Sequence, residues 1–272
     1  MLLLLSDLQN ALFTAVAESV DGDNNNNNTS NPSVAVAFSG GLDSALLAKI
    51  CKDLGIKATL LTIGFSHSHD IEFSKIIASK IGLAHTIYTL DEKEFCDVLS
   101  YVKQKIRCEN VSHIENCIAY FYIANLASRF GLQQVLTANG CDELFCGYNE
   151  YRLVYNSGRA HIMQLMDEKI VNEMTLMSEI ETITSEIGIK VKKPFLTDKF
   201  ISFAKDIAID QKIKGSNDLV RKHILRTVAL SIGLPEESAM KPKKAIQYST
   251  MIHKKFKNLS KSQYRSQFTT NR

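Results

Sequence analysis

The chain has 272 residues, of which 45% are hydrophobic and 22% charged, a composition typical of a globular protein that can bury a sizeable core. Its formal net charge of +3 gives no argument for nucleic acid as a ligand. Six cysteines without a C-x-x-C pair argue against a disulfide framework and against a zinc motif.

The N-terminal 20 residues predict an amphipathic helix. Its apolar positions recur at helical spacing: Leu4, Leu5, Leu8, Leu12, Ala15 and Val16. Polar residues interrupt this run well before the ~20 apolar residues that a bilayer-spanning helix needs, and no basic residues precede it as in a signal peptide. We therefore expect a cytoplasmic protein without a membrane partner. Residues 21–32, with five consecutive asparagines, cannot bury apolar surface and predict a flexible loop.

Strands and helices alternate through residues 33–150. We expect strands at 34–38, 58–63, 86–90 and 135–137, and helices at 43–54, 71–81, 93–106 and 114–130. This alternation predicts an α/β fold with a doubly wound parallel sheet, whose ligands bind at the carboxyl ends of the strands. The strand signal fades in residues 151–272, where 163–187, 197–207 and 219–232 predict helices. With no obvious linker between the two parts, we expect residues 1–272 to form a single domain.

The segment Ser39-Gly40-Gly41-Leu42-Asp43-Ser44 directly follows the first predicted strand. Gly40 and Gly41 carry no Cβ, so the backbone can bend tightly and approach a ligand. The helix that begins near Asp43 presents free N–H groups and the positive end of its dipole, which suit a phosphate. Asp43 would repel a phosphate unless a cation lies between them, which suggests Mg²⁺. An ordinary strand-to-helix turn with two glycines is the alternative.

A second glycine turn with acidic residues follows the fourth predicted strand, where Gly140 precedes Asp142 and Glu143. Carboxylates from two strand ends, Asp43 and Asp142, suit one Mg²⁺ that clamps a polyphosphate. The alternative is that Asp142 and Glu143 only stabilise a helix N-terminus.

The first segment resembles the pyrophosphate-binding loop of the PP-loop ATP pyrophosphatases, which have an adenine nucleotide alpha hydrolase-like fold. Together with the second, it resembles the synthetase domain of the asparagine synthetase family. The likeness continues in the same order through nearly the whole chain, at Ile63–Phe65, Lys193–Phe200, Lys222–Arg226, Leu234-Pro235 and Lys241–Gln247.

This resemblance implies an ATP-dependent, AMP-forming amidoligase. A carboxylate, for which aspartate is the expected substrate, attacks the α-phosphorus of Mg·ATP, and ammonia then displaces AMP from the acyl-AMP. The implied catalytic residues are Asp43, Asp142 and one of Lys243 and Lys244, and the two aspartates are the implied Mg²⁺ ligands. The implied ATP and pyrophosphate site comprises Phe38, Ser39, Gly40, Gly41, Asp43, Ser44, Ile63, Gly64, Thr137, Ala138 and Gly140.

Two departures from the family pattern matter. Asn139 stands where the family has a glutamate, so Glu109, Glu115 or water would have to assist the attack of ammonia. The chain also starts with the helix that normally follows the family's glutaminase domain. We therefore expect it to use free ammonium or to depend on a separate glutaminase subunit, and a homodimer is left open.

Other functions compete with this interpretation. One is a PP-loop tRNA-modifying enzyme that adenylates a base, with Cys141 or Cys146 as a persulfide carrier. Another is a non-catalytic subunit that binds ATP in a complex. The cluster His67-Ser68-His69-Asp70 could hold a metal ion, although helix capping by Ser68 or Asp70 explains it as well.

Overall fold

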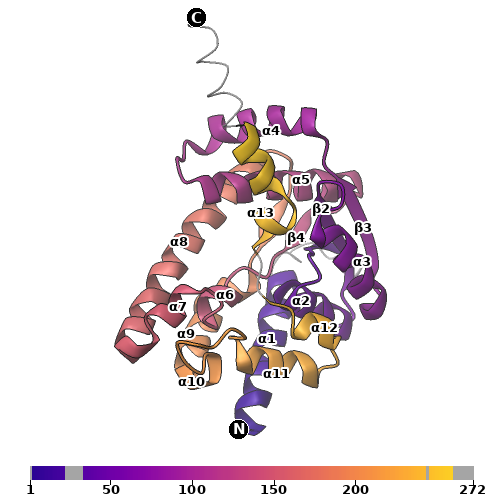
Figure 1. Cartoon of the computed structure of the whole chain (residues 1–272). Helices are drawn as coiled ribbons and strands as arrows, with labels where there is room; N and C mark the ends of the chain where they lie inside the picture. The colour runs from indigo at the N-terminus through magenta and orange to yellow at the C-terminus, as the bar shows by residue number, and fades with distance from the viewer. Residues whose placement is uncertain (1, 22–32, 243–244, 260–272) are drawn as a thin grey trace, which may run out of the picture.

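A computed structural model describes residues 2–21, 33–242 and 245–259 of the chain. The predicted flexible loop after residue 21 and the candidate catalytic residues Lys243 and Lys244 lie outside the described residues. Five parallel strands form one sheet in the order β3-β2-β1-β4-β5 (Figure 1). The strands are β1 Ser33–Ala37, β2 Lys57–Gly64, β3 Ala84–Thr89, β4 Gln134–Leu136 and β5 Lys190–Lys192.

The helices of the first half confirm the predicted alternation within one or two residues at most of their ends. They are α1 Leu2–Asp21, α2 Leu42–Asp53, α3 His69–Ile81, α4 Glu92–Ile106, α5 Val111–Arg129 and α6 Cys141–Leu144. The second half is mainly helical, as predicted. Its labelled helices are α7 Glu150–Leu153, α8 Arg159–Ser185, α9 Asp198–Asp206, α10 Ile209–Lys212, α11 His223–Ser231, α12 Glu236–Ala239 and α13 Ile246–Ser249, with 3₁₀ turns η1 Tyr155–Ser157 and η2 Pro194–Leu196. Residues 252–259 are helical as well.

Two clusters of buried apolar side chains cover the two faces of the sheet. Val34 and Val36 of β1 join a cluster with α1, α2, α3 and α11, whereas Ala35 between them joins a cluster with α4 and α5. Successive side chains of a strand point to opposite faces, so a sheet covered on both sides requires apolar residues at every position. This explains the continuous apolar run of β1 and confirms the doubly wound parallel sheet.

Helix α8 spans both clusters along one side of the molecule (Figure 1). Its first half contributes Met166 to the cluster beside α1, and its second half contributes Met177 and Ile180 to the cluster beside α5. The helix is 27 residues long, which lets it link the two layers at the carboxyl edge of the sheet. Asn172, Glu173 and Leu176 of its middle turns face that edge, whereas Val171 and Met174 are exposed to solvent.

Two predictions for the second half are wrong. The sequence analysis finds no strand there, but β5 pairs with β4 in parallel, with Val191 opposite Val135. The strand escapes prediction because it has three residues and two of them are lysines. The helix predicted over 219–232 begins only at His223, because Arg221 and Lys222 adopt left-handed backbone conformations with φ of 52° and 54°.

The N-terminal helix is amphipathic, as predicted. Leu8, Leu12 and Val16 are fully buried, while Leu4 and Leu5 are partly buried against the same core. Leu3 is 81% exposed and lies on the opposite face. Within the described ranges, no helix combines the length and the apolar character that crossing a bilayer would require.

Candidate active site

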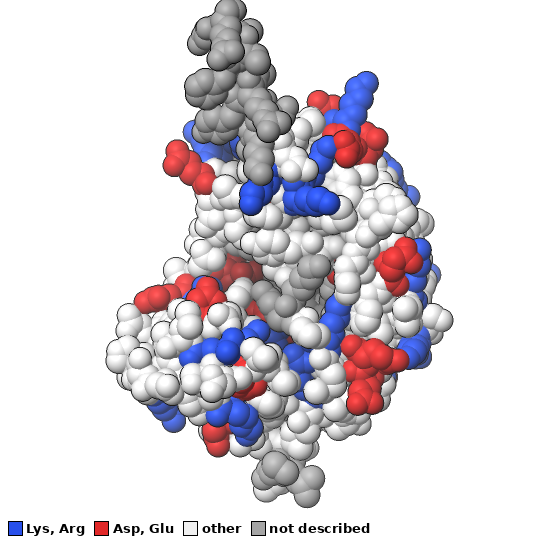
Figure 2. Space-filling view, in the orientation of Figure 1, with Lys and Arg blue, Asp and Glu red and all other residues white. Residues whose placement is uncertain are grey.

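A cavity of about 620 Å³ opens at the carboxyl edge of the sheet. Figure 2 shows the molecule hollowed there, with acidic and basic side chains in and around the hollow. Nearly all the predicted site residues that the structure describes line this cavity: Phe38, Ser39, Gly41, Asp43, Ser44, Ile63, Thr137, Ala138, Gly140 and Asp142. Of the described residues predicted to bind ATP, Gly40 and Gly64 do not belong to the lining.

The loop between β1 and α2 is compact. Gly40 has φ of 73°, and a Cβ there would lie 3.0 Å from Phe73 Cδ1 and 3.2 Å from the Cα of Ser74. A side chain at this position would therefore meet α3 as well as backbone strain. The carbonyl oxygen of Gly40 accepts a hydrogen bond from Ser238 Oγ at 2.7 Å, which fixes the turn from below the cavity.

Two hydroxyl groups meet within the same loop. Ser39 Oγ lies 3.1 Å from Ser44 Oγ, and the backbone N–H of Ser39 donates to Ser44 Oγ at 3.2 Å. The N–H of Gly41 donates to Ser39 Oγ at 3.3 Å. These bonds are long, and the first turn of α2 follows directly at Leu42. The loop thus offers hydroxyl and amide donors that can turn to an anion at a helix N-terminus.

Lys222 joins the two aspartates that the sequence assigns to Mg²⁺. Its Nζ lies 2.6 Å from Asp43 Oδ2 and 2.6 Å from Asp142 Oδ1. The residue is 2% exposed. Burial by itself would lower the pKa of Lys222, but the carboxylates of Asp142 and Asp43 outweigh burial and raise it above its ordinary value. Lys222 is therefore a buried ammonium ion held between two carboxylates.

The backbone around this triad is shaped to fit it. Lys222 has φ of 54°, an uncommon left-handed conformation for a residue other than glycine, asparagine or aspartate. Gly147 packs against the pair from the other side, where a Cβ would lie 2.0 Å from Asp142 Oδ1 and 2.4 Å from Lys222 Cε. Lys222 belongs to a segment that resembles the family, but the sequence assigns it no role. Its partners lie far away in sequence, Asp43 at a separation of 179 residues.

The carboxylates also satisfy the chemical requirements for Mg²⁺. Both reach within 2.6 Å of one atom, so they converge on a single point and can share a cation. Carboxylate oxygens are the hard ligands that this ion prefers. Lys222 Nζ lies at that point, so a divalent ion held by both carboxylates would have to replace the ammonium group there.

Glu143 stabilises the second glycine turn. It is 2% exposed, and its carboxylate accepts the N–H of Gly140 at 3.0 Å and the hydroxyl of Tyr148 at 2.5 Å. Burial, together with the nearby carboxylates of Glu173 and Asp142, raises the pKa of Glu143 to about 8. One interpretation of the sequence is that Glu143 only stabilises a helix N-terminus. The hydrogen bond from Gly140, which directly precedes α6, agrees with that interpretation.

The amide of Asn139 lies in a network of polar side chains. Its Oδ1 accepts hydrogen bonds from Tyr120 Oη at 2.7 Å and from Thr137 Oγ1, and its Nδ2 donates to Glu173 Oε1. Glu173 lines the cavity and is 6% exposed. A carboxylate from α8 therefore lies beside the position at which the family glutamate is replaced. Glu173 could not be identified from the sequence, because it belongs to a helical pattern without a motif.

The two carboxylates that the sequence analysis suggests as substitutes lie elsewhere. Among the described residues, neither Glu109 nor Glu115 lines the cavity. Glu115 is buried and pairs with His253 Nδ1 at 2.9 Å, and burial raises its pKa. Glu173 is better placed than either of them to act on a bound ligand.

Arg226 holds the segment that leads to the predicted catalytic lysines. Its guanidinium donates to the carbonyl oxygens of Ala239 at 2.6 Å, Lys241 at 3.2 Å, Val220 at 2.9 Å and Arg221 at 2.8 Å. Burial lowers the pKa of Arg226 from its usual high value. Arg226 and Lys241 both line the cavity, so positive charge faces it from the helical half.

The candidate persulfide cysteines are poorly suited to nucleophilic chemistry. Cys141 and Cys146 are fully buried. Burial raises the pKa of Cys141 far above its ordinary value and that of Cys146 to about 12. Both side chains are therefore neutral thiols at physiological pH, whereas the thiolate is the reactive form. In the part of the chain that the structure describes, His67, His69 and Asp70 form no metal-binding group.

The parallel sheet, with its Ser-Gly-Gly-Leu-Asp-Ser loop at the carboxyl edge, defines an α/β protein of the PP-loop ATP pyrophosphatase class. The family model described as asparagine synthase matches residues 26–161 and 153–272. The chain therefore belongs to the asparagine synthase family.

Named relatives agree with this assignment. The chain is 27% identical over 256 residues to a putative glutamine-hydrolysing asparagine synthetase of Methanocaldococcus jannaschii, which covers 81% of this chain and 47% of that protein. It is 28% identical over 202 residues to a glutamine-hydrolysing asparagine synthetase of Oryza sativa, covering 70% of this chain and 34% of the relative. The chain thus spans about half, or less, of the length of the curated relatives it matches.

Two solved structures are also similar. One is a predicted subunit of tRNA methyltransferase from Methanocaldococcus jannaschii, with 21% identity, a TM-score of 0.36 and coverage of 76% of this chain and 92% of that one. The other is the U34-tRNA thiolase of Methanococcus maripaludis, with 14% identity, a TM-score of 0.46 and coverage of 94% and 75%. With TM-scores below 0.5, neither likeness bears on what this chain acts on.

Proposed function

We propose that this chain is an AMP-forming amidoligase that adenylates a small carboxylate, with aspartate as the first candidate, and transfers the acyl group to ammonia. The observation that carries the proposal is the convergence of Asp43, Asp142 and the Ser39–Ser44 loop on one cavity. Its volume of about 620 Å³ suits a nucleotide together with a small acid.

The first step needs charge neutralisation at the phosphates. The hydroxyls of Ser39 and Ser44 and the N–H groups at the start of α2 bind the leaving pyrophosphate, while Asp43 and Asp142 hold Mg²⁺. When bound, this ion neutralises phosphate charge as the bond to the α-phosphorus breaks. Phe38, Ile63, Thr137 and Ala138 form the wall for adenosine, and Lys243 or Lys244 adds positive charge in the transition state.

The second step needs a proton acceptor. Ammonia attacks the carbonyl carbon of the acyl-AMP, AMP leaves, and the surplus proton on nitrogen must be removed. Glu173 is the proposed acceptor, because its carboxylate lines the cavity and bonds Asn139, which replaces the family glutamate. Asn139 then orients Glu173 and has no acid–base role of its own.

The experiment is a pyrophosphate-release assay with the purified chain, Mg·ATP and ammonium, screened over amino acids and over tRNA. Release that depends on an amino acid, with AMP and an amide as products, supports the proposal. Release that depends on tRNA, or ATP binding without release under any condition, contradicts it. The Asp43→Asn variant serves as the control for contaminating activity, because it removes a proposed metal ligand.

A further inference from the structure

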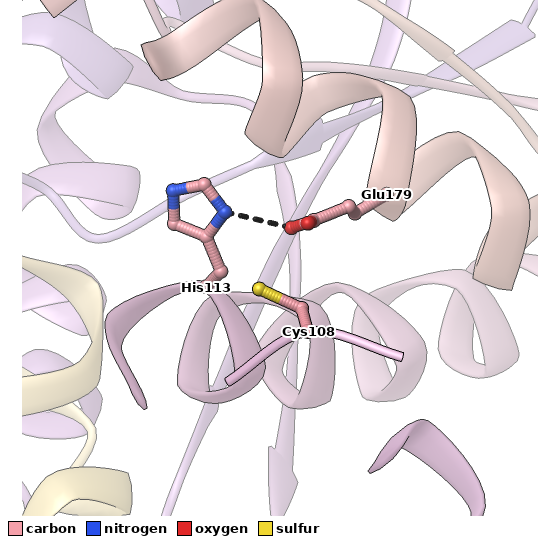
Figure 3. Close-up of side chains that lie close together, drawn as sticks. All are labelled: Cys108, His113 and Glu179. Carbon is pink, nitrogen blue, oxygen red and sulfur yellow. Dashed lines mark hydrogen bonds and ion pairs between the residues drawn. The ribbon is translucent and has the colours of Figure 1, made fainter. Parts of the chain in front are cut away.

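A second group of metal-ligating side chains lies next to the same cavity, whose lining includes one of them, His113. Cys108 lies in the connection between α4 and α5, His113 in the first turn of α5, and Glu179 on α8 (Figure 3). One ligand atom from each of them lies within 4.8 Å of the other two. Three separate elements thus bring a thiol, an imidazole and a carboxylate to one place.

The histidine–glutamate hydrogen bond and the Cys108 thiol place hydrogen atoms between the three ligand atoms, in the position that a cation would occupy. His113 Nδ1 lies 2.7 Å from Glu179 Oε2, and His113 Nε2 lies 3.2 Å from Asn172 Oδ1. Figure 3 shows the thiol of Cys108 beside this histidine–glutamate pair. Partial burial, with the carboxylate of Glu179 among the further causes, raises the pKa of Cys108. The unmetallated group is therefore a protonated thiol and an imidazole gathered around one carboxylate.

The distances between the three ligand atoms and the chemical type of these ligands favour zinc. Bond lengths of about 2.0–2.3 Å from Zn²⁺ to nitrogen, oxygen and sulfur place tetrahedral ligands about 3.3–3.8 Å apart. The observed group is within small side-chain rotations of this arrangement, since its separations range from 2.7 Å to at most 4.8 Å. A thiolate and an imidazole are the ligands of Zn²⁺ rather than of Mg²⁺.

The surroundings resemble those of a metal ligand. His113 is only 5% exposed, and its second ring nitrogen faces the Asn172 side chain, as the outer nitrogen of a metal-bound histidine usually faces a polar partner. His113 and Asn172 both line the main cavity. Glu179 is 17% exposed at its side chain, so an ion can reach the group from solvent.

We propose that Cys108, His113 and Glu179 form a three-ligand Zn²⁺ site beside the candidate active-site cavity, which it meets at His113, and separate from the proposed Mg²⁺ site at Asp43 and Asp142. Binding of Zn²⁺ displaces the thiol proton of Cys108, so the affinity rises with pH over the range in which this thiol titrates. The fourth coordination position is left to a non-protein ligand such as water.

The test measures metal content and spectra of the purified chain. After dialysis against Zn²⁺ and removal of free metal, we expect about one bound Zn²⁺ per chain by elemental analysis, because the described residues hold one group of this kind. Substitution by Co²⁺ should give a thiolate-to-metal charge-transfer band in the near ultraviolet and visible bands typical of tetrahedral cobalt. Binding should release protons, measured in weakly buffered solution.

The variants locate the site. Cys108→Ser should abolish the charge-transfer band and weaken Zn²⁺ binding at least about 100-fold, and Glu179→Gln should weaken it while keeping the band. Cys96→Ser is the matched control, because this cysteine is also half-buried and lies on α4, outside the group. Zinc binding that is unchanged in Cys108→Ser, equal loss in Cys96→Ser, or no binding by the unaltered chain would overturn the proposal and leave an ordinary histidine–glutamate pair.

Discussion

Replacing Lys222 by methionine tests whether one buried ammonium ion holds the two aspartates together. Methionine keeps the length of the side chain and removes the charge. Asp43 Oδ2 and Asp142 Oδ1 each lie 2.6 Å from Lys222 Nζ, so these oxygens are at most twice that distance apart. At an effective dielectric constant near 20, two unit charges at about 5 Å repel by about 3 kcal/mol.

We therefore expect Lys222→Met to lower the free energy of unfolding by about 3 kcal/mol in the absence of divalent ions, close to the cost of removing one partner of a buried ion pair. Mg²⁺ should restore much of this loss, because it can take the vacated position between the carboxylates. The unaltered chain should gain less from Mg²⁺, since its ammonium group competes with the ion. Urea unfolding with and without millimolar Mg²⁺ measures both effects.

Lys212→Met provides the matched control. Lys212 is also fully buried, and burial lowers its pKa to about 8, but its Nζ donates to the carbonyl oxygen of Ala204 at 2.6 Å. This variant should show no rescue by Mg²⁺. If Lys222→Met unfolds like the unaltered chain, or if Mg²⁺ stabilises both variants equally, Lys222 does not hold the two carboxylates and the two aspartates do not share a cation.

Three further predictions concern the same cavity. Glu173→Gln should slow amide formation by about 100-fold or more while pyrophosphate release continues, which rapid-quench analysis can separate; equal slowing of both steps would contradict a role for Glu173 in proton removal. Because the folded pKa of Glu143 is raised to about 8 from an ordinary 4.5, its contribution to stability is fully present below pH 4.5 and is lost as the pH rises to about 8. Urea unfolding at several pH values should show a shallower decline for Glu143→Gln, and an unchanged decline would exclude this group as its source. Gly147→Ala places a Cβ 2.0 Å from Asp142 Oδ1, so it should weaken binding of Mg·ATP, measured by calorimetry, whereas Gly215→Ala, where a Cβ meets nothing within 4 Å, should not.

The fold could be predicted largely because its signals are local. A continuous apolar strand, a glycine turn and an amphipathic helix recur through the first half, and Gly82 ends α3 in the left-handed conformation that helix ends favour. β5 lacks such a signal, since a lysine stands on each side of its single valine. It forms because Val191 completes the apolar layer beside Val135, which is a tertiary effect.

The residues of the candidate site likewise divide into those with a local sequence signal and those that only tertiary contacts bring to the site. Asp43 and Asp142 could be found because each follows a strand and a glycine turn. Lys222 and Glu173 could not, because neither lies in a strand-end motif and their contacts come from other parts of the chain. The zinc-type group likewise has no sequence spacing to reveal it, since His113 and Glu179 are separated by 66 residues.

The hydrogen bonds of Arg226 have a consequence for how a nucleotide reaches the cavity. Four carbonyl oxygens satisfy its guanidinium, and none of them carries a full negative charge. An arginine in an ion pair must give up that partner, or share it, before it can attract a ligand. Arg226 is instead held rigidly by neutral partners in the lining of the cavity, where it is buried and where the carboxylates of Asp43 and Asp142 lie near enough to favour its charged form. A polyphosphate that enters the cavity therefore meets a positive charge already fixed in position, which requires no rearrangement of Arg226, beside the carboxylates of Asp43 and Asp142 that also line the cavity.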